Sequence, residues 1–450
     1  MNYLDIVSVA ASVPFTILGI MFFHFIVFSV VGIFCKKTYP ETDKKNRYGI
    51  IIPARNEETV VAGLIESIRK NNYPQDRIEI FVIAHNCTDR TAEVARGLGA
   101  TVYEYDNPAE NTMGYAFRYL FSQIERDFGT QTFDGFLLLN ADNILDRNYL
   151  SRINDAFAYY GGECVVTSFR NSKNFGANLI SGLYGVYFAV GCRYESRGRT
   201  VTGCSTRVQG TGYLINSRLV RDGWPYVTLA EDWEFTADQI IRSNKIRYCD
   251  DAVFYDEQPT SLRIMWRQRV RWSRGHLIVF YTRIRDLLRG LFAKKTKNRG
   301  SLYDIFANVL PSTLFFLLLQ VIQLVLFLIA PLVDENLTLK EVLFGSGGNF
   351  LTSSGLLFTW LRSGAVSYVT LVLSAVMIFA LERKRIKNVS LPLKILVSLF
   401  WPLFLGIQFI IDVQALFSTH LGWKPIPHSD CTSFDALHAG EAEENKLGVG

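Results

Sequence analysis

Apolar and polar positions alternate in a regular way over the first half of this chain. From Tyr48 to about Tyr255, short apolar runs alternate with amphipathic stretches, which is the pattern of strands and helices in an α/β sheet. Strands are predicted at 48–52, 78–84, 101–105 and 136–139, and helices at 59–70, 89–98 and 114–128. Ligands of open α/β sheets bind beyond the carboxyl ends of the strands. The polar residues that follow these strands are therefore expected to share one pocket.

Four longer runs contain no formal charge, namely Ile6–Phe34, Ile305–Val333, Ser363–Leu381 and Ile395–Ile411. The first two exceed the roughly 20 residues that cross a bilayer core. The last is shorter and contains Pro402, which leaves a re-entrant or interfacial helix open. No Lys or Arg precedes the first run, so residues 1–35 are predicted to be a retained anchor and not a signal peptide. Four membrane spans are predicted.

Basic residues follow the first and third runs: Lys36, Lys37, Lys44, Lys45 and Arg47, then Arg383, Lys384, Arg385 and Lys387. The positive-inside rule places both stretches in the cytoplasm, which predicts an integral plasma-membrane protein with a cytoplasmic domain at 48–258. The tail then lies outside if all four runs cross, and inside if the last is re-entrant. The seven cysteines are scattered and form no C-x-x-C, so neither a disulfide framework nor a zinc site is indicated. The net charge of +5 fits a domain held near membrane lipid, and nothing indicates nucleic acid.

After Tyr255 the chain becomes basic and aromatic. Arginines alternate with Trp, Phe, Leu and Ile through residues 259–295, which predicts amphipathic helices that lie in the membrane interface. Residues 303–417 are then expected to form a membrane region of about three helices. The tail at 418–450 is rich in Ala, Gly and Glu from Asp435 onward, and that end is predicted to be disordered.

Short polar motifs stand at the edges of these predicted elements. They are Pro53-Ala-Arg-Asn56-Glu57, Asn86-Cys-Thr-Asp89, Met113-Gly-Tyr-Ala, Asn140-Ala-Asp142-Asn143, Gln209-Gly210-Thr211-Gly212, Ala230-Glu231-Asp232 and Gln268-Arg-Val-Arg271-Trp272. A carboxylate at a strand end suits Mg²⁺ or Mn²⁺, which bind few protein oxygens together with substrate phosphates. Each motif also has a purely structural interpretation, because Asp89 and Glu231-Asp232 could begin helices and Asp142-Asn143 could form a turn.

In this order and spacing the motifs resemble those of membrane-integrated family-2 glycosyltransferases, the class of cellulose, hyaluronan, chitin-oligosaccharide and poly-N-acetylglucosamine synthases. The resemblance covers about Tyr48 to Gly275. It implies an α/β fold in which a GT-A-type nucleotide-sugar domain is inserted between transmembrane helices, followed by an amphipathic interfacial helix. It also implies transfer of a sugar from a nucleotide donor with inversion at the anomeric carbon.

The resemblance implies roles for individual residues. Donor-binding roles fall on Pro53, Asn56, Glu57, His85, Asp89, Met113, Asn140 and Arg271. Acceptor-binding roles fall on Gly210, Thr211, Gly212, Gln268 and Trp272. Asp232 would be the general base, with Glu231 beside it, and Asp142 would bind the Mg²⁺ or Mn²⁺ cofactor.

Three donor-side positions depart from the family pattern. His85 stands where relatives carry an Asp, Met113 where they carry a Lys, and Asn140 where they carry the first acid of a D-x-D motif. Each change removes a charge from the predicted donor site, whereas Glu231-Asp232 and Gln268, Arg271 and Trp272 are kept. This contrast favours an altered donor site over an inactive enzyme.

The sequence therefore predicts a membrane-bound enzyme that moves a sugar, with UDP as the expected nucleotide, to a growing polysaccharide or a lipid-linked acceptor. Two alternatives stay open, a single-addition glycolipid transferase and a catalytically degenerate relative that binds glycan or nucleotide and regulates a partner synthase. Because four spans are few for a translocation channel, a polymer made here would need a homo-oligomer or an export partner.

Overall fold

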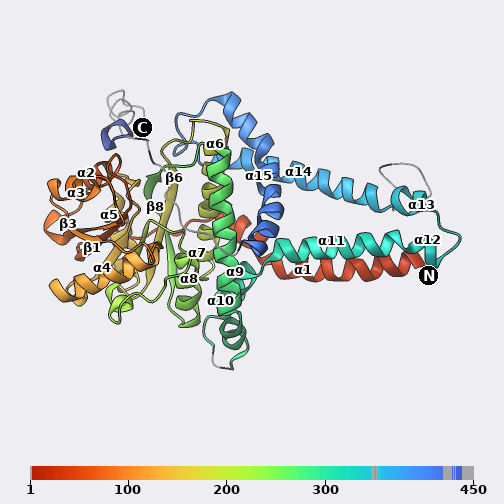
Figure 1. Cartoon of the computed structure of the whole chain (residues 1–450), viewed down its shortest axis with the longest axis horizontal. Helices are drawn as coiled ribbons and strands as arrows, with labels where there is room; N and C mark the ends of the chain where they lie inside the picture. The colour runs from red at the N-terminus through yellow and green to blue at the C-terminus, as the bar shows by residue number, and fades with distance from the viewer. Residues whose placement is uncertain are drawn as a thin grey trace.

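The structure, a computed structural model, describes residues 3–294, 296–345, 350, 353, 355–418, 428, 430 and 432–437. A globular α/β part lies at one end, and long helices project from it (Figure 1). The disorder predicted for residues 435–450 falls almost wholly outside the described residues.

The globular part is built on one eight-stranded sheet in the order β3-β2-β1-β4-β7-β6-β8-β5. The strands are β1 (Tyr48–Ala54), β2 (Ile78–His85), β3 (Thr101–Tyr105), β4 (Gly135–Leu138), β5 (Ile144–Leu145), β6 (Val165–Ser172), β7 (Tyr213–Asn216) and β8 (Ile246–Asp256). Strand β1 pairs in parallel with β2 and β4, and β2 pairs in parallel with β3. All four strands predicted from the apolar pattern are present, and their carboxyl ends meet at one edge.

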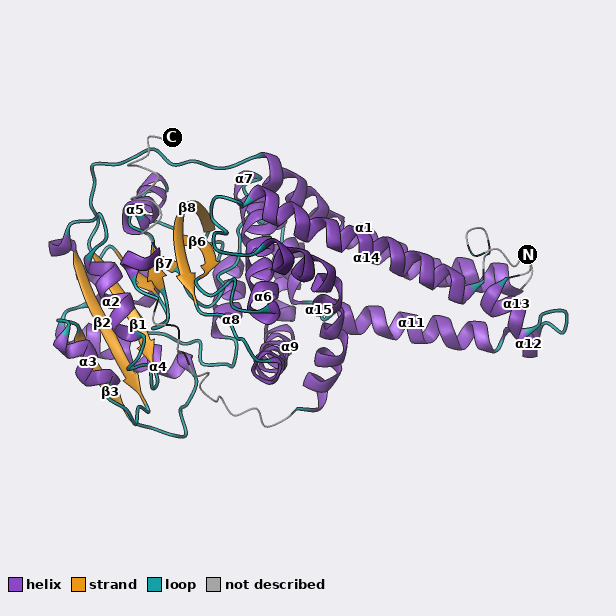
Figure 2. Cartoon of the chain, turned by 90° about the horizontal axis from the view of Figure 1, so that it is seen from above, coloured by secondary structure: helices purple, strands orange, loops and turns teal. Residues whose placement is uncertain are grey.

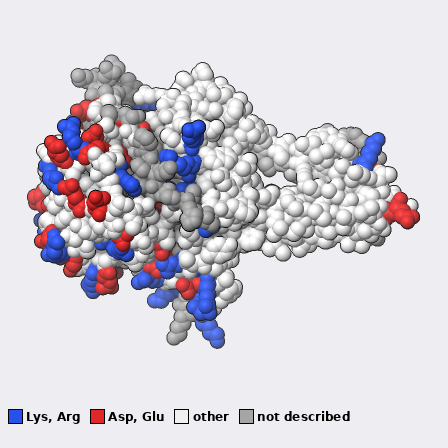
Figure 3. Space-filling model, viewed as in Figure 1, with Lys and Arg blue, Asp and Glu red and all other residues white. Residues whose placement is uncertain are grey.

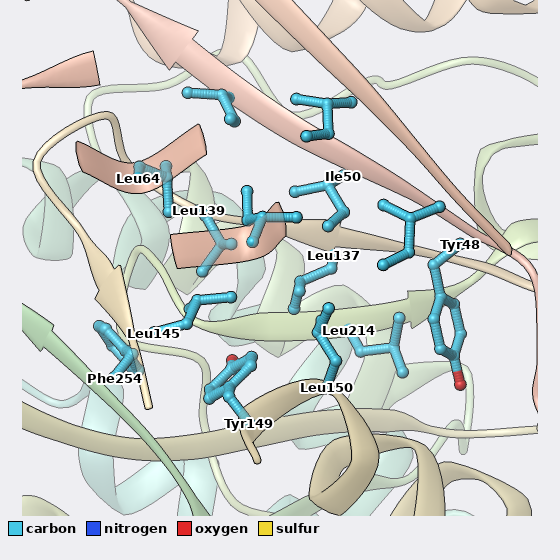
Figure 4. Packing of buried hydrophobic residues seen from close by; sticks show 14 of the residues in the cluster. Tyr48, Ile50, Leu64, Leu137, Leu139, Leu145, Tyr149, Leu150, Leu214 and Phe254 are labelled. Atoms are coloured by element: carbon cyan, nitrogen blue, oxygen red, sulfur yellow. The ribbon is translucent and has the colours of Figure 1, made fainter. Parts of the chain in front are cut away.

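Two hydrophobic clusters pack against the two faces of the sheet. Helices α2 (Val61–Arg69), α3 (Thr91–Gly97) and α5 (Tyr149–Tyr159) contribute to the first cluster, in which Ile50, Leu137 and Leu214 of the strands meet Tyr149 and Leu150 of α5 (Figure 4). Helices α4 (Met113–Asp127), α8 (Glu231–Ile241), α9 (Leu262–Phe292) and α10 (Arg299–Val309) contribute to the second. The sheet is therefore sandwiched between helices, as a mostly parallel sheet requires.

Four helical segments are long and apolar enough to cross a membrane. They are α1 (Tyr3–Phe34), α11 (Ser312–Leu328) with the short α12 (Ala330–Val333), α14 (Leu356–Leu381) and α15 (Leu391–Phe417). Helices α1, α11 and α14 project together, whereas α15 lies at their base beside the globular part (Figures 1 and 2). The projecting helices carry almost no charged side chains except at their far tip, and the charges gather on the globular part (Figure 3).

The second span is shorter than the apolar run predicted. The run Ile305–Val333 was expected to be one helix, but α10 ends at Val309 and α11 begins at Ser312. Pro311 lies between them, and proline lacks an amide hydrogen and disrupts a continuous helix. Ile305 and Val309 consequently pack in the second core cluster, and the span begins at Ser312.

The first span is fixed tightly to the globular part. An added Cβ at Gly198, in α7 (Arg197–Val201), would lie 2.0 Å from the carbonyl oxygen of Phe28 in α1. The Arg199 Nε donates to Asp304 Oδ2 of α10 at 2.7 Å, and His24 of α1 contacts the same carboxylate. The start of the membrane region is thus held against the helices that cover the sheet.

Candidate active site

One cavity of about 430 Å³ lies where the sheet meets the membrane helices. Eight of the site residues predicted from sequence line it: Met113, Asn140, Gly210, Glu231, Asp232, Gln268, Arg271 and Trp272. Residues of α6 (Leu179–Val190), α11 and α15 complete its wall. The fold therefore brings the predicted catalytic acids, the arginine and the tryptophan to a single space.

Glu231 and Asp232 form the first turn of α8, where the helix dipole favours negative charge. Burial raises the pKa of Glu231, and the Asp232 carboxylate beside it raises that pKa further, while Arg271 opposes the shift. Burial also raises the pKa of Asp232. A carboxylate whose pKa is raised toward neutrality is a stronger base, which suits it to remove a proton from a hydroxyl group.

Arg271 reaches this pair from α9. Its Nη1 donates to the carbonyl oxygen of Leu229 at 3.1 Å, just before the acidic turn. Trp272 lines the same cavity and meets Tyr184 edge-on, with ring centroids 6.1 Å apart and planes at 73°. The cavity therefore offers a base, a cation and an aromatic wall.

The glycine-rich loop connects the Asn140 turn with the acids. Gly210 has φ +80°, and an added Cβ there would lie 3.7 Å from Asp232 Oδ2. Thr211 Oγ1 accepts from the Asn140 N–H at 2.9 Å and donates to Asn143 Oδ1 at 2.5 Å. At Gly212 (φ +69°) an added Cβ would lie 2.1 Å from the Phe254 ring. Thr211 and Gly212 thus fix the loop through contacts with the protein, and only Gly210 of the three lines the cavity.

The donor-side residues Pro53, Asn56, Glu57, His85 and Asp89 gather at the carboxyl ends of β1 and β2 and do not line this cavity, whereas Met113, Asn140 and Arg271 do. Pro53 lies within β1, and Asn56 follows it with φ 58°. Asn56 Oδ1 accepts from the Thr88 N–H at 2.7 Å, and Asp89 accepts from the backbone N–H groups of Glu58 and Thr91, both at 3.1 Å. Asn56 and Asp89 therefore join the two loops to each other.

His85 is directed at the protein itself. Its Nε2 lies 2.7 Å from the carbonyl oxygen of Glu110, and its ring stacks on Tyr105 at 5.4 Å. Burial lowers its pKa, and only 4% of the residue is exposed. The histidine thus fixes the segment that leads into α4 and Met113.

A second cluster surrounds Asp142. Its Oδ2 accepts from the Glu257 N–H at 2.9 Å. His428, far away in the sequence, places Nδ1 2.9 Å from both carboxylate oxygens of Glu57, and the Asp430 N–H donates to Glu257 Oε2 at 3.0 Å. Sequence reasoning missed His428 and Glu257, because no local motif marks a residue that returns to the sheet after the last long helix.

The carboxylates of this cluster attract positive charge. Burial lowers the pKa of His428, but the carboxylates of Asp142, Glu57 and Glu257 outweigh it and raise the value to about 9, so the region stabilises positive charge. Within the described ranges, no three His, Cys, Asp or Glu side chains are arranged as metal ligands. Asp142 would therefore hold Mg²⁺ or Mn²⁺ jointly with phosphate oxygens.

Polar contacts also join α9 to the membrane helices. Arg269 Nη2 donates to Gln408 Oε1 of α15 at 2.8 Å, and Ser273 Oγ donates to Asp412 Oδ1 at 2.6 Å. Thr313 of α11 contacts the same Asp412 carboxylate. These residues line the cavity. Thr313, Gln408 and Asp412 lie in or beside apolar runs, which gave no signal that these three residues belong to the site.

Together, the mostly parallel sheet, the acid-bearing turn after β4 and the acidic start of α8 define a GT-A-type glycosyltransferase domain. The family model described as "Glycosyltransferase like family 2" matches residues 46–275. The chain therefore belongs to this family.

Relatives and a solved structure agree with this assignment. The chain is 26% identical over 277 residues to a probable glycosyltransferase, YdaM, of Bacillus subtilis (60% of this chain, 63% of the relative). It is 22% identical over 284 residues to the poly-beta-1,6-N-acetyl-D-glucosamine synthase of Staphylococcus aureus (62% and 65%). These matches span less than two thirds of either relative. The mannosyltransferase PcManGT of Pyrobaculum calidifontis, solved with GDP-Man and Mn²⁺, shares the fold with a TM-score of 0.56 at 13% identity, over 93% of this chain and 100% of that one.

Proposed function

We propose that the protein is a membrane-bound inverting glycosyltransferase that moves a sugar from a UDP-linked donor to a saccharide acceptor attached to lipid. One observation carries the proposal. The cavity that contains Asp232 is also lined by Thr313 of α11 and Gln408 of α15, so the proposed base shares one space with two of the helices that are long and apolar enough to cross a membrane. This relation between base and membrane helices favours an acceptor held at the bilayer.

Each of three residues would have one role in the transfer reaction. Asp232 takes the proton of the acceptor hydroxyl, whose oxygen forms a bond to the anomeric carbon while the bond from that carbon to the diphosphate breaks. The nucleoside diphosphate leaves with the bonding electrons, and the Arg271 guanidinium in the same cavity balances its charge. Asp142 would hold the divalent cation, which supplies further neutralisation of the diphosphate. Attack opposite the leaving group inverts the anomeric configuration.

The donor assignment rests on the loops at the carboxyl ends of the strands. Asn56, Glu57 and Asp89 lie at the ends of β1 and β2, where open α/β sheets bind nucleotides. His85 contacts the carbonyl oxygen of Glu110. It would therefore affect donor binding indirectly, by fixing the position of the segment that leads into α4. Met113 and Asn140 line the cavity, so they would face the transferred sugar and the diphosphate.

Processive polymer synthesis is the second candidate. Gln268, Arg271 and Trp272 all line the cavity, and a poly-beta-1,6-N-acetyl-D-glucosamine synthase is among the relatives. Another relative is a beta-monoglucosyldiacylglycerol synthase of Synechocystis, 24% identical over 236 residues, which is consistent with a single addition to lipid. The product length distinguishes the two.

We further propose that three helices cross the plasma membrane and that the catalytic domain, 48–258, is cytoplasmic. His428 and Asp430 contact Glu57 and Glu257 of the globular part, so the chain after α15 lies on the same side as that part. The α15 helix would then lie at the interface, next to α9 of the 259–295 segment, and residues 1–35 and 312–381 would form the membrane region.

Release of nucleoside diphosphate tests the proposal. The purified protein in nanodiscs is incubated with a panel of nucleotide sugars, with Mn²⁺ and Mg²⁺ in separate arms. Asp232→Asn is expected to lower the release rate by roughly 10²- to 10⁴-fold while nucleotide binding stays unchanged. Binding without release from any donor in the wild-type protein would overturn the enzyme assignment in favour of a regulatory, non-catalytic role.

A further inference from the structure

The acceptor side of the cavity contains polar atoms that the protein leaves without a partner. Tyr184 Oη, Gln268 Oε1 and His276 Nε2 are buried and have no hydrogen-bond partner within the described residues, and all three residues line the cavity. Buried polar groups in native proteins are nearly always hydrogen-bonded. Three unpartnered groups in one cavity therefore indicate a polar ligand.

The charge state of His276 limits what that ligand can be. Burial lowers the pKa of His276 to about 4, and the nearby Arg207 lowers it further, so the imidazole is neutral at physiological pH. The backbone of Asn308 hydrogen-bonds the ring, which leaves Nε2 as the free nitrogen. Gln268 Oε1 can only accept, and a tyrosine hydroxyl can donate or accept. These three groups are all uncharged and suit the hydroxyl groups of a ligand.

Aromatic rings form part of the cavity wall beside these polar groups. Tyr184 packs edge-on against Phe404, with ring centroids 5.5 Å apart, and against Trp272 at 6.1 Å. Trp233 also lines the cavity, and its ring centroid lies 4.6 Å from that of His276. An aromatic wall with a few polar groups at its edge suits a ligand with apolar faces and a hydroxylated rim. A neutral pyranose ring has that chemistry, and the hydroxyl of a simple lipid does not.

We propose that Tyr184 and His276 bind the terminal pyranose of the acceptor and thereby select a saccharide over a sugar-free lipid alcohol. This inference rests on the proposed function, because it assigns the acceptor of that same reaction. Neither residue belongs to a motif noted in the sequence. They lie on α6 and α9, 92 positions apart, and the cavity brings them together.

The test uses Tyr184→Phe and His276→Ala in nanodiscs that contain no sugar-based detergent. Tyr149→Phe is the matched control, because Tyr149 is equally buried but its hydroxyl is bonded to Ser168 at 2.9 Å outside the cavity. The acceptors are cellotetraose and chitotetraose as neutral saccharides and diacylglycerol as the sugar-free alcohol. We measure the KM for the acceptor, the KM for the donor and hydrolysis of the donor by water.

Each cavity variant is expected to raise the KM for a tetrasaccharide at least tenfold and to leave the donor KM and donor hydrolysis within twofold. Tyr184→Phe should also leave the melting temperature unchanged or raised, because the removed hydroxyl has no partner in the protein. A tetrasaccharide KM unchanged in both variants, or equal losses with diacylglycerol, would overturn the inference. Failure of the wild-type protein to use any donor would instead overturn the proposed function. Binding of the tetrasaccharides to Asp232→Asn, followed by Trp fluorescence, separates the two failures.

Discussion

Gly275 of α9 lies directly against Ala230, the residue before the acidic turn of α8. An added Cβ at Gly275 would lie 2.6 Å from the Cβ of Ala230 and 3.1 Å from its backbone nitrogen. One helical turn before Gly275, Arg271 donates to the carbonyl oxygen of Leu229. The absence of a side chain at Gly275 therefore allows α9 to bring the Arg271 guanidinium next to the acidic turn of α8.

Gly275→Ala is expected to separate α9 from α8 and to lower kcat by about 10- to 100-fold, because displacement of a reacting group by about 1 Å has effects of that size. The free energy of unfolding should fall by about 1–3 kcal/mol from overpacking. Gly290→Ala on the same helix is the control, since its added Cβ would meet only the Leu302 side chain, at 3.3 Å. Equal activity of the two variants in donor-release assays would show that this contact does not position Arg271.

The pH dependence of activity and that of stability should have opposite signs. Burial and the neighbouring Asp232 raise the pKa of Glu231 from 4.5 to about 8. The folded state therefore holds the proton of the Glu231–Asp232 pair more tightly than the unfolded state does. The stability that this proton contributes is fully present below about pH 4.5, the ordinary pKa of Glu231, and is lost as the pH rises through 8. The proposed base Asp232, whose pKa burial also raises, must be deprotonated, so kcat should rise with pH as the pair loses its protons, while the melting temperature falls.

Glu231→Gln provides the check on that assignment. The substitution removes the repulsion between the two carboxylates, so the apparent pKa of the kcat profile should shift to lower pH. The fall in melting temperature between pH 6 and 8 should also become smaller. Rate and thermal-unfolding profiles that match those of the wild-type protein would assign the titration to another group.

His428 provides a separate pH-sensitive contact. Its pKa of about 9 exceeds the ordinary histidine value of about 6.5. Its contact with Glu57 is therefore at full strength below about pH 6.5 and weakens as the pH rises through 9. NMR of the six ¹⁵N-labelled histidines should show one that titrates near 9. Glu57→Gln should lower that value, and its failure to do so would remove Glu57 as the cause.

The sequence predicted the local elements well, because the apolar period records which face is buried. Strand 101–105 is observed with the bounds predicted, and the strand predicted at 48–52 is observed two residues longer, ending at Ala54. The error at Ile305–Val333 also comes from this dependence on the apolar pattern. Hydropathy cannot tell a core segment from a membrane segment, and Ile305 lies in the core.

The site was predictable only where its residues belong to local motifs. Asp232, Arg271 and Trp272 line the cavity as expected, whereas Tyr184 and His276 reach it from α6 and α9 without a sequence signal. Asn56 and Asp89 connect the loops after β1 and β2 by hydrogen bonds, and these bonds also depend on tertiary contacts. The sequence placed both residues at the correct edge, but it could not show which atoms were already hydrogen-bonded.

Reversal of the donor-side changes tests whether the enzyme has an altered donor site or a decayed one. Met113 and Asn140 line the cavity, so Met113→Lys and Asn140→Asp would introduce one positive and one negative charge beside the proposed position of the diphosphate. His85→Asp is unsuitable, because His85 holds the Glu110 segment and its loss would also perturb the fold.

If the present residues suit the native donor, the double variant should lose at least tenfold in kcat/KM for that donor and change its preference within the nucleotide-sugar panel. Large activation from a near-zero rate would instead mean that the wild-type site had lost residues it needs. Arg118→Lys is the control on α4, since it keeps the charge opposite Glu110, which Arg118 contacts at 2.7 Å, and it should leave the donor preference unchanged.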